Sequence, residues 1–155
     1  MPSTHANILL HAVFSTKNRF KLIRDDWQDE LFAYIGGTLR EHKANLVKAG
    51  GVEDHVHLLF QSHPSFAIAD TLRLIKANSS KWINEQRKVP AKFQWQTGYG
   101  VFSVSQSVKA AVSRYIDRQR EHHAKQSYES EFLQLLDLHC VQYRKEFVFD
   151  QELHG

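Results

Sequence analysis

The order in which strand-like and helix-like segments follow one another constrains the fold of this chain more than any other feature. Short segments with strand-like apolar patterns occupy residues 5–17, 45–52, 55–61 and 99–105. Longer segments with apolar residues at three- and four-residue spacing occupy residues 25–42, 66–86 and 108–122. This order predicts an α+β fold with a ferredoxin-like split βαβ arrangement, in which helices cover one face of an antiparallel sheet. The helix over 108–122 is an addition to that arrangement.

The length of the chain fits one domain. With 155 residues the chain can bury a single core, and we expect one domain over residues 1–155. Within it, residues 126–155 are expected to form a C-terminal helix and an acidic tail. No apolar run approaches the roughly 20 residues of a membrane span, and the single cysteine cannot form an internal disulfide. Because the N-terminus also lacks a secretory signal pattern, we expect a cytoplasmic protein with no membrane partner.

Basic residues are concentrated between residues 73 and 92, a stretch in which Glu85 is the one acidic residue. Such a stretch is commonly the solvated face of a helix, and it is also what a phosphate-binding surface requires. The residues predicted to contact a DNA backbone are Arg73, Lys76, Lys81, Arg87 and Lys88. Charge alone does not decide between the two interpretations.

The most informative motif is the strand-like sequence HVHLLF at residues 55–60. Side chains alternate along a strand, so His55 and His57 project from one face, about 6 to 7 Å apart, and Val56 projects from the other. Two imidazoles so placed can share a metal ion, although a hydrogen-bonded surface pair has the same spacing. A histidine-triad nucleotide hydrolase would need a further histidine in place of Leu59, and an amidohydrolase would need a barrel of about 250 residues, so both are disfavoured.

A second motif, YIDRQ at residues 115–119, places Tyr115 and Gln119 four residues apart, and therefore on one face of a helix. A tyrosine on an apolar stripe is usually a core residue, and neither residue alone indicates a function. Their position after the histidine motif, the basic helix and the sequence WQTGYGVFSVS makes the combination informative.

In this order of motifs, the chain resembles the single-tyrosine HUH transposases of small bacterial insertion sequences. This is the IS-two-hundred-like group, which includes transposases associated with repetitive extragenic palindromes. The resemblance covers most of the chain and rests on LLHAVFSTKNR, GGVEDHVHLLF, WQTGYGVFSVS and YIDRQREHH. It implies that the additional helix is catalytic and carries the nucleophile Tyr115. The metal ligands that it implies are His55, His57 and Gln119.

The resemblance also implies a reaction and partners. The reaction is metal-dependent cleavage and rejoining of single-stranded DNA through a covalent 5′-phosphotyrosine, as in DNA transposition. Two imidazoles with oxygen ligands suit Mg²⁺ or Mn²⁺ better than a closed zinc site, which favours thiolates. One ester replaces another, so no nucleotide cofactor is expected, and the sequence contains no GxxxxGK[ST] loop. The implied partners are single-stranded DNA with hairpin ends and a second copy of the chain in a homodimer. The implied location is the bacterial or archaeal cytoplasm, with nucleoid association during activity.

Two other interpretations stay open. A relaxase or replication initiator would use the same histidine pair and tyrosine, but such proteins are usually larger and place the motifs in another order. A ferredoxin-like module that binds single-stranded nucleic acid without catalysis would use a basic face. Such a module would tolerate the change Tyr115→Phe, whereas a nucleophile would not.

Overall fold

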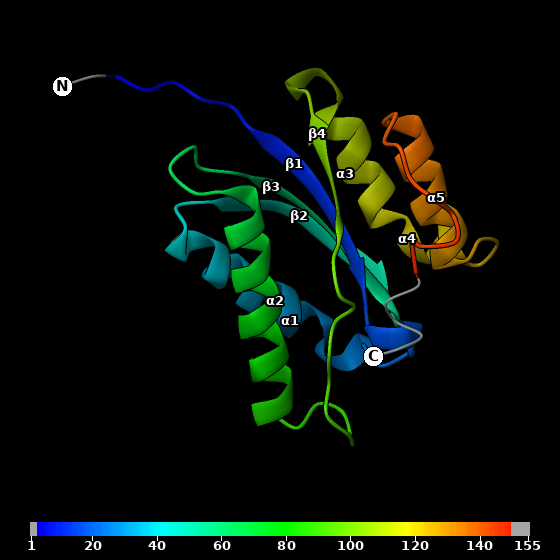
Figure 1. Ribbon diagram of the computed structural model, residues 1–155. Helices are drawn as coiled ribbons and strands as arrows, with labels where there is room; N and C mark the ends of the chain where they lie inside the picture. Colours follow the sequence, from blue (N-terminus) through cyan, green and yellow to red (C-terminus); the bar gives the residue numbers. More distant parts are fainter. Residues whose placement is uncertain (1–2, 150–155) are drawn as a thin grey trace.

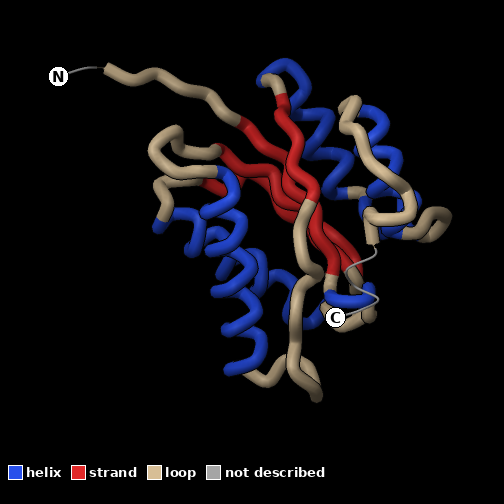
Figure 2. Tube along the Cα trace, in the orientation of Figure 1, coloured by secondary structure: helices blue, strands red, loops and turns tan. Residues whose placement is uncertain are grey.

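The computed structural model describes residues 3–149, and its centre is a four-stranded antiparallel sheet (Figure 1; Figure 2). In sheet order the strands are β2 (Asn45–Val52), β3 (His55–Gln61), β1 (Leu9–Ser15) and β4 (Gly100–Val104). β1 pairs with both β3 and β4 in antiparallel register. β2 and β3 form a hairpin around a two-residue turn, Glu53 and Asp54. The predicted α+β fold and strand arrangement are confirmed.

Two long helices cover one face of the sheet (Figure 1). They are α1 (Asp25–Glu41) and α2 (Ile68–Glu85). Every second side chain of β1 and β3 faces these helices and is apolar, because alternate positions of a strand project to opposite faces. The core on this face includes Leu10, Ala12, Phe14, Val56, Leu58, Phe60, Leu31, Ile35, Leu72 and Ile75. No helix in the described part of the chain is both long and apolar enough to cross a membrane.

Three shorter helices cover the opposite face (Figure 1). They are α3 (Lys109–Asp117), α4 (Gln119–His123) and α5 (Tyr128–Leu138). A second apolar cluster joins β1 and β4 to α5, and its buried members are Val13, Phe102, Tyr128, Phe132, Leu135 and Leu136. The predicted C-terminal helix is therefore α5, while the end of the predicted acidic tail, residues 150–155, lies outside the described residues. The additional layer thus contains three helices, and it is this layer that covers the histidine face of β3.

The helix predicted over residues 108–122 is not continuous in the structure. It consists of a 3-10 turn, η2 (Gln106–Val108), followed by α3 and α4. α3 and α4 are separated at Arg118, whose φ of −97° and ψ of 20° interrupt the helical backbone. Contacts on the far side of the break hold α4 in its new direction, since Arg120 pairs with Glu53 of the hairpin turn at 3.1 Å. A further 3-10 turn, η1 (Lys17–Arg19), follows β1.

Candidate active site

The two histidines of β3 lie side by side on the sheet face that α3, α4 and α5 cover. His55 and His57 are fully buried, and their ring centroids are 5.1 Å apart. Val56, between them, belongs to the core on the other face. The rigid β2–β3 hairpin therefore presents both imidazoles in the same direction, as strand alternation requires.

The Nδ1 atom of each ring is already engaged, which fixes the direction of the Nε2 atom. Nδ1 of His55 lies 2.7 Å from Oδ1 of Asp54, in the hairpin turn. Nδ1 of His57 lies 2.8 Å from Nε2 of His11, a buried β1 residue that the sequence analysis did not single out. Both Nε2 atoms are left to face the additional helices. Metal-binding histidines typically have such a partner on the other ring nitrogen.

α3 places Tyr115 over the histidine pair. This helix can lie directly against β2 because position 50 is a glycine: a Cβ atom at Gly50 would lie 2.5 Å from the backbone oxygen of Ile116. Tyr115, next to Ile116, is half-buried, and its ring centroid lies 5.7 Å from that of His57. The tyrosine of one chain therefore lies beside the histidines of the same chain.

Gln119, the first residue of α4, also reaches the histidines. Its side chain is buried, and its Oε1 atom lies 3.0 Å from Nε2 of His55. Its Nε2 atom donates to Oε2 of Glu131 at 3.1 Å, which orients the amide. The structure thus brings together the four residues of the two sequence motifs, namely His55, His57, Tyr115 and Gln119.

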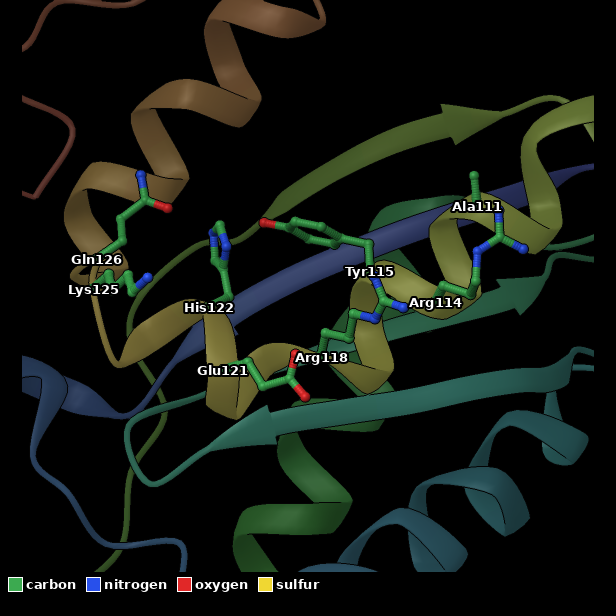
Figure 3. Close-up of a pocket in the computed structure, with 8 residues that line it drawn as sticks. All are labelled: Ala111, Arg114, Tyr115, Arg118, Glu121, His122, Lys125 and Gln126. Atoms are coloured by element: carbon green, nitrogen blue, oxygen red, sulfur yellow. The ribbon is translucent and has the colours of Figure 1, made fainter.

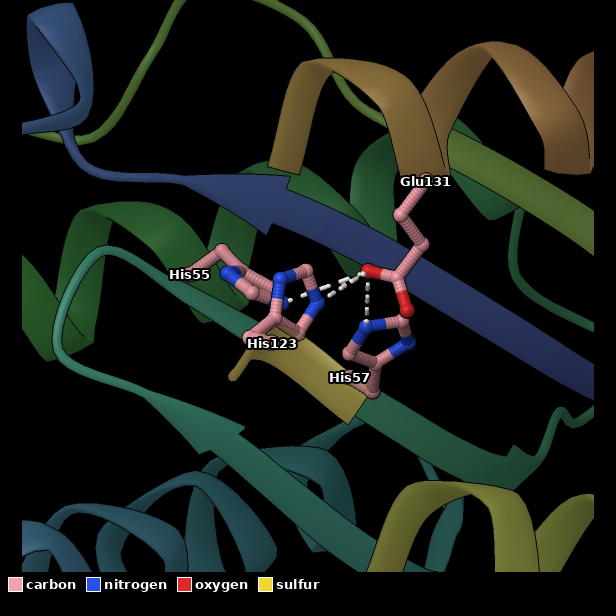
Figure 4. A group of neighbouring side chains, drawn as sticks. All are labelled: His55, His57, His123 and Glu131. Atoms are coloured by element: carbon pink, nitrogen blue, oxygen red, sulfur yellow. Dashed lines mark hydrogen bonds and ion pairs between the residues drawn. The ribbon is translucent and has the colours of Figure 1, made fainter. Parts of the chain in front are cut away.

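Two residues that the sequence analysis missed complete the cluster (Figure 4). Glu131, from α5, is 1% exposed, and its Oε1 atom lies 2.9 Å from Nε2 of His57 and 3.0 Å from Nε2 of His123 in α4. Its Oε2 atom accepts a hydrogen bond from the hydroxyl of Tyr115. One candidate ligand atom from each of His55, His57, His123 and Glu131 lies within 4.8 Å of all the others. Imidazoles and a carboxylate are a donor set that can hold a divalent cation.

The family of IS200-like transposases matches residues 4–119. The chain belongs to this family. The match includes the histidine pair, Tyr115 and Gln119, and it ends before α5. The family predicted from the sequence motifs is confirmed.

Two solved structures share the fold of this transposase. One is a candidate transposase from Deinococcus radiodurans R1, with a TM-score of 0.61 and 24% identity over 77% of this chain and 95% of that chain. The other is a REP-associated tyrosine transposase bound to a REP hairpin, with a TM-score of 0.60 and 12% identity over 79% of this chain and 74% of that chain. None of the curated proteins compared with the chain matches it. At these identities the likeness shows the fold.

Burial and the Glu131 carboxylate set the charges in the transposase site. Burial lowers the pKa of His57 to about 4. Burial acts in the same direction on His55, but hydrogen bonds to Asp54 and Glu131 outweigh it and raise the pKa to about 9. Burial and the bond to Glu131 raise the pKa of the Tyr115 hydroxyl well above its ordinary value. The phenol is therefore held protonated in this arrangement.

The basic residues predicted to contact DNA lie on the other face of the sheet. Arg73, Lys76 and Lys81 belong to α2, and Arg87 and Lys88 follow it. Lys76 donates to two backbone carbonyls at 2.6 Å each, and Lys88 pairs with Glu30 at 3.0 Å. DNA bound at Tyr115 would have to pass an edge of the sheet to reach them, and their role stays a prediction.

Other basic side chains line a hollow directly beside Tyr115 (Figure 3). Its lining includes Arg114, Tyr115, Arg118, His122, Lys125 and Gln126, from α3, α4 and the loop that follows. Arg114 and Arg118 stand four residues apart in the sequence, a spacing from which a common helix face could have been predicted. Glu121 also lines the hollow, so the half-buried tyrosine opens on a surface where Arg114, Arg118 and Lys125 outnumber one carboxylate.

Proposed function

We propose that this transposase cuts and rejoins single-stranded DNA, with Tyr115 as the nucleophile and a divalent metal ion as cofactor. The metal ligands in this proposal are His55, His57 and Gln119. The observation that carries it is that nucleophile and ligands meet at one carboxylate. One oxygen of Glu131 accepts a hydrogen bond from the Tyr115 hydroxyl, and the other oxygen contacts Nε2 of His57. Such proximity is what attack on a bound phosphate needs.

The proposed reaction exchanges one phosphate ester for another. The Tyr115 oxygen attacks the phosphorus and forms a bond to it, while the bond from phosphorus to the 3′ oxygen breaks. The phenol loses a proton and the departing 3′ oxygen gains one, which leaves a 5′-phosphotyrosine and a free 3′ hydroxyl. Because the ester is exchanged and not hydrolysed, rejoining needs no nucleotide cofactor.

The donor atoms of the site fit a divalent cation. Nδ1 of His55 and Nδ1 of His57 are engaged elsewhere, so both Nε2 atoms are available for Mg²⁺ or Mn²⁺. When bound, such an ion would polarise the phosphate and offset charge in the transition state. The phenol still has to lose its proton, and the Glu131 carboxylate is the group in hydrogen-bond contact with it.

The surroundings of Tyr115 support an extended anionic substrate. Arg114, Arg118 and Lys125 in the adjoining hollow can contact phosphates on either side of the bond that is cut. The more distant basic residues would contact flanking DNA, and they are Arg73, Lys76, Lys81, Arg87 and Lys88. The similar REP-associated transposase is bound to a REP hairpin, which supports single strands with hairpin ends as substrate. A homodimer at the nucleoid of a bacterial or archaeal cell would supply two nucleophiles for the two ends of an excised segment.

A covalent protein–DNA adduct that resists denaturant tests the proposal. We expect the wild-type protein to form it with hairpin-bearing single strands from its own genomic flanks when Mn²⁺ or Mg²⁺ is present. Tyr115→Phe should form no adduct and still bind the DNA, because only a hydroxyl is removed. Tyr143→Phe is the matched control, since its hydroxyl also donates to a carboxylate, that of Asp137, at 2.9 Å. An adduct formed by Tyr115→Phe, or full activity in excess chelator, would overturn the proposal.

A further inference from the structure

We infer that His123 and Glu131 are metal ligands as well, so that three imidazoles and a carboxylate join the Gln119 oxygen around the ion and the site prefers a transition-metal ion to Mg²⁺. The inference rests on the proposed function for the role of His55 and His57. His123 and Glu131 lie beyond residue 119, where the match to the transposase family ends. Family membership therefore does not account for their place in the cluster, whereas the contacts of the two side chains do.

The backbone contact of His123 fixes where its lone pair points. Nδ1 of His123 lies 2.6 Å from the backbone oxygen of Gln126. A carbonyl oxygen can only accept a hydrogen bond, so Nδ1 carries the hydrogen and Nε2 of the neutral ring carries a lone pair. That Nε2 lies 3.0 Å from Oε1 of Glu131, which is also an acceptor. Two acceptors therefore face each other at hydrogen-bond distance.

The same conflict recurs at His55. Its Nδ1 donates to the Asp54 carboxylate, so in the neutral ring its Nε2 would present a lone pair 3.3 Å from Oε1 of Glu131, and without a metal ion a second proton on the ring relieves that conflict. Nε2 of His57 lies 2.9 Å from the same oxygen. Additional protons on all three rings would turn the acceptors into donors. They would also place like charges on rings whose centroids are only 4.4 Å apart for His55 and His123, which is unfavourable in a buried site.

A single divalent cation resolves these conflicts without additional protons. The four candidate ligand atoms lie within 4.8 Å of one another, close enough to share one ion. Each imidazole also has a partner on its other nitrogen, namely Asp54, His11 or the Gln126 carbonyl. Such partners hold ligating rings in orientation in metal sites.

Glu131 itself needs a compensating positive charge. It is 1% exposed, and a buried carboxylate is costly without a cation nearby. Its contacts within residues 3–149 are with Tyr115, Gln119 and histidines. Among these partners a positive charge comes from a protonated histidine, and a metal ion held by the neutral rings supplies the same charge without that proton.

Three imidazoles change which ion the site prefers. Mg²⁺ favours oxygen ligands and retains its water, whereas imidazole nitrogen favours transition-metal ions such as Zn²⁺ and, with a carboxylate, Mn²⁺. In the proposed site Oε1 of Glu131 binds the ion, while Oε2 keeps the hydroxyl of Tyr115. The Glu131 carboxylate, on α5, then contacts both the metal ion and the proposed nucleophile.

Binding of Mn²⁺ to the full chain without DNA tests the inference. We expect calorimetry to give one site per chain, with an affinity lowered about 10- to 100-fold or more in His123→Ala and in Glu131→Gln. An equal concentration of Mg²⁺ should not displace the bound Mn²⁺. Pulsed EPR of the bound ion should detect three coordinated imidazoles in the wild type and two in His123→Ala. The matched controls His63→Ala and Glu129→Gln, the latter on the same helix as Glu131, should bind as the wild type does.

Wild-type affinity in both His123→Ala and Glu131→Gln, or only two imidazoles on the ion in the wild type, would overturn the inference. Circular dichroism separates the loss of a ligand from the loss of the fold, and if His123→Ala is unfolded, the imidazole count in the wild type decides. The adduct assay keeps the two proposals distinct. A Tyr115-dependent adduct with unchanged Mn²⁺ affinity in both variants leaves the proposed function standing without this inference. If Mn²⁺ binding depends on His123 and Glu131 but no adduct forms, this inference stands and the proposed function fails.

Discussion

At the scale of single residues, His11 contacts a proposed metal ligand, His57, without being a ligand itself. It reaches across from β1 to Nδ1 of His57 at 2.8 Å, and both side chains are buried. In His11→Ala, Nδ1 of His57 loses this partner, and neither the tautomer nor the ring orientation is fixed. We expect the Mn²⁺ affinity to fall about 10- to 100-fold, as for other residues that support ligands. Calorimetric titration of a variant shown to be folded checks this, and an unchanged affinity would contradict the positioning role.

Buried histidines also make the stability of the metal-free chain depend on pH. Burial lowers the pKa of His11 to about 3 and that of His57 to about 4, from an ordinary 6.5. The unfolded chain therefore binds more protons than the fold as the pH drops below 6.5, and stability is lost toward acid. His55, with a pKa of about 9, contributes stability that is complete below 6.5 and is lost as the pH rises through 9. In chelator, the urea midpoint should decline on both sides of a maximum near 6.5. A midpoint that rises steadily as the solution becomes more acidic would contradict this, because the fold would then bind more protons than the unfolded chain.

Glu131 shows which parts of the site could be predicted from the sequence. The histidine pair and the tyrosine motif follow local rules of two- and four-residue spacing, so their common faces were predictable. Glu131 lies on the buried stripe of α5 with Tyr128, Phe132 and Leu135, and a carboxylate on an apolar stripe is a sign of a buried partner. The identity of that partner was not predictable, because it depends on how α5 packs against strands that lie much earlier in the sequence.

At the scale of elements, the contact between α3 and β2 determines where Tyr115, the proposed nucleophile, lies. In Gly50→Ala the new Cβ would lie 2.5 Å from the backbone oxygen of Ile116, so the backbone of α3 or of β2 has to move. We expect a loss of about 1 to 3 kcal/mol in the free energy of unfolding, typical of overpacking. The yield of adduct should also fall, because Tyr115 is the neighbour of Ile116. Urea denaturation and the adduct assay measure the two effects.

Gly37→Ala is the control for that substitution. Gly37 lies inside α1, and its new Cβ would have Arg40 Nη2, at 3.6 Å, as its nearest neighbour. Alanine is favoured over glycine inside a helix by about 0.5 to 1 kcal/mol, so this variant should be more stable with an unchanged adduct yield. Equal behaviour of the two variants would show that Gly50 has no special role in placing α3.

The elements themselves were largely predictable, with one instructive exception. The strands and the helices α1, α2 and α5 follow from apolar periodicity and turn residues, which are local properties. The break at Arg118 was not predictable, because residues 117–123, DRQREHH, contain no glycine or proline to mark it. Contacts distant in sequence hold α4 beyond the break, among them Gln119 with His55 and Arg120 with Glu53.

At the scale of the whole molecule, each chain holds a complete set of site residues. Tyr115 and the histidine pair of one chain both contact Glu131 of that chain. We therefore expect that co-expressed His57→Ala and Tyr115→Phe chains form no adduct at any ratio, even within a homodimer. Recovery of activity in the mixture would show instead that chains exchange the helix that carries the tyrosine. Wild-type chains expressed in the same way provide the reference yield.

The hydrogen bond between His57 and Glu131 spans 74 positions of the chain. During synthesis on a ribosome, the β2–β3 hairpin and the core beneath α1 and α2 can form while α5 has yet to be made. The newly made chain can therefore form much of its fold before the site around His57 is complete. A product released early, before residue 131, would keep both recognisable sequence motifs and lack the carboxylate that joins them. An interrupted gene of this kind would still be identified as a transposase gene from its motifs, although its protein would lack Glu131, which contacts both Tyr115 and His57.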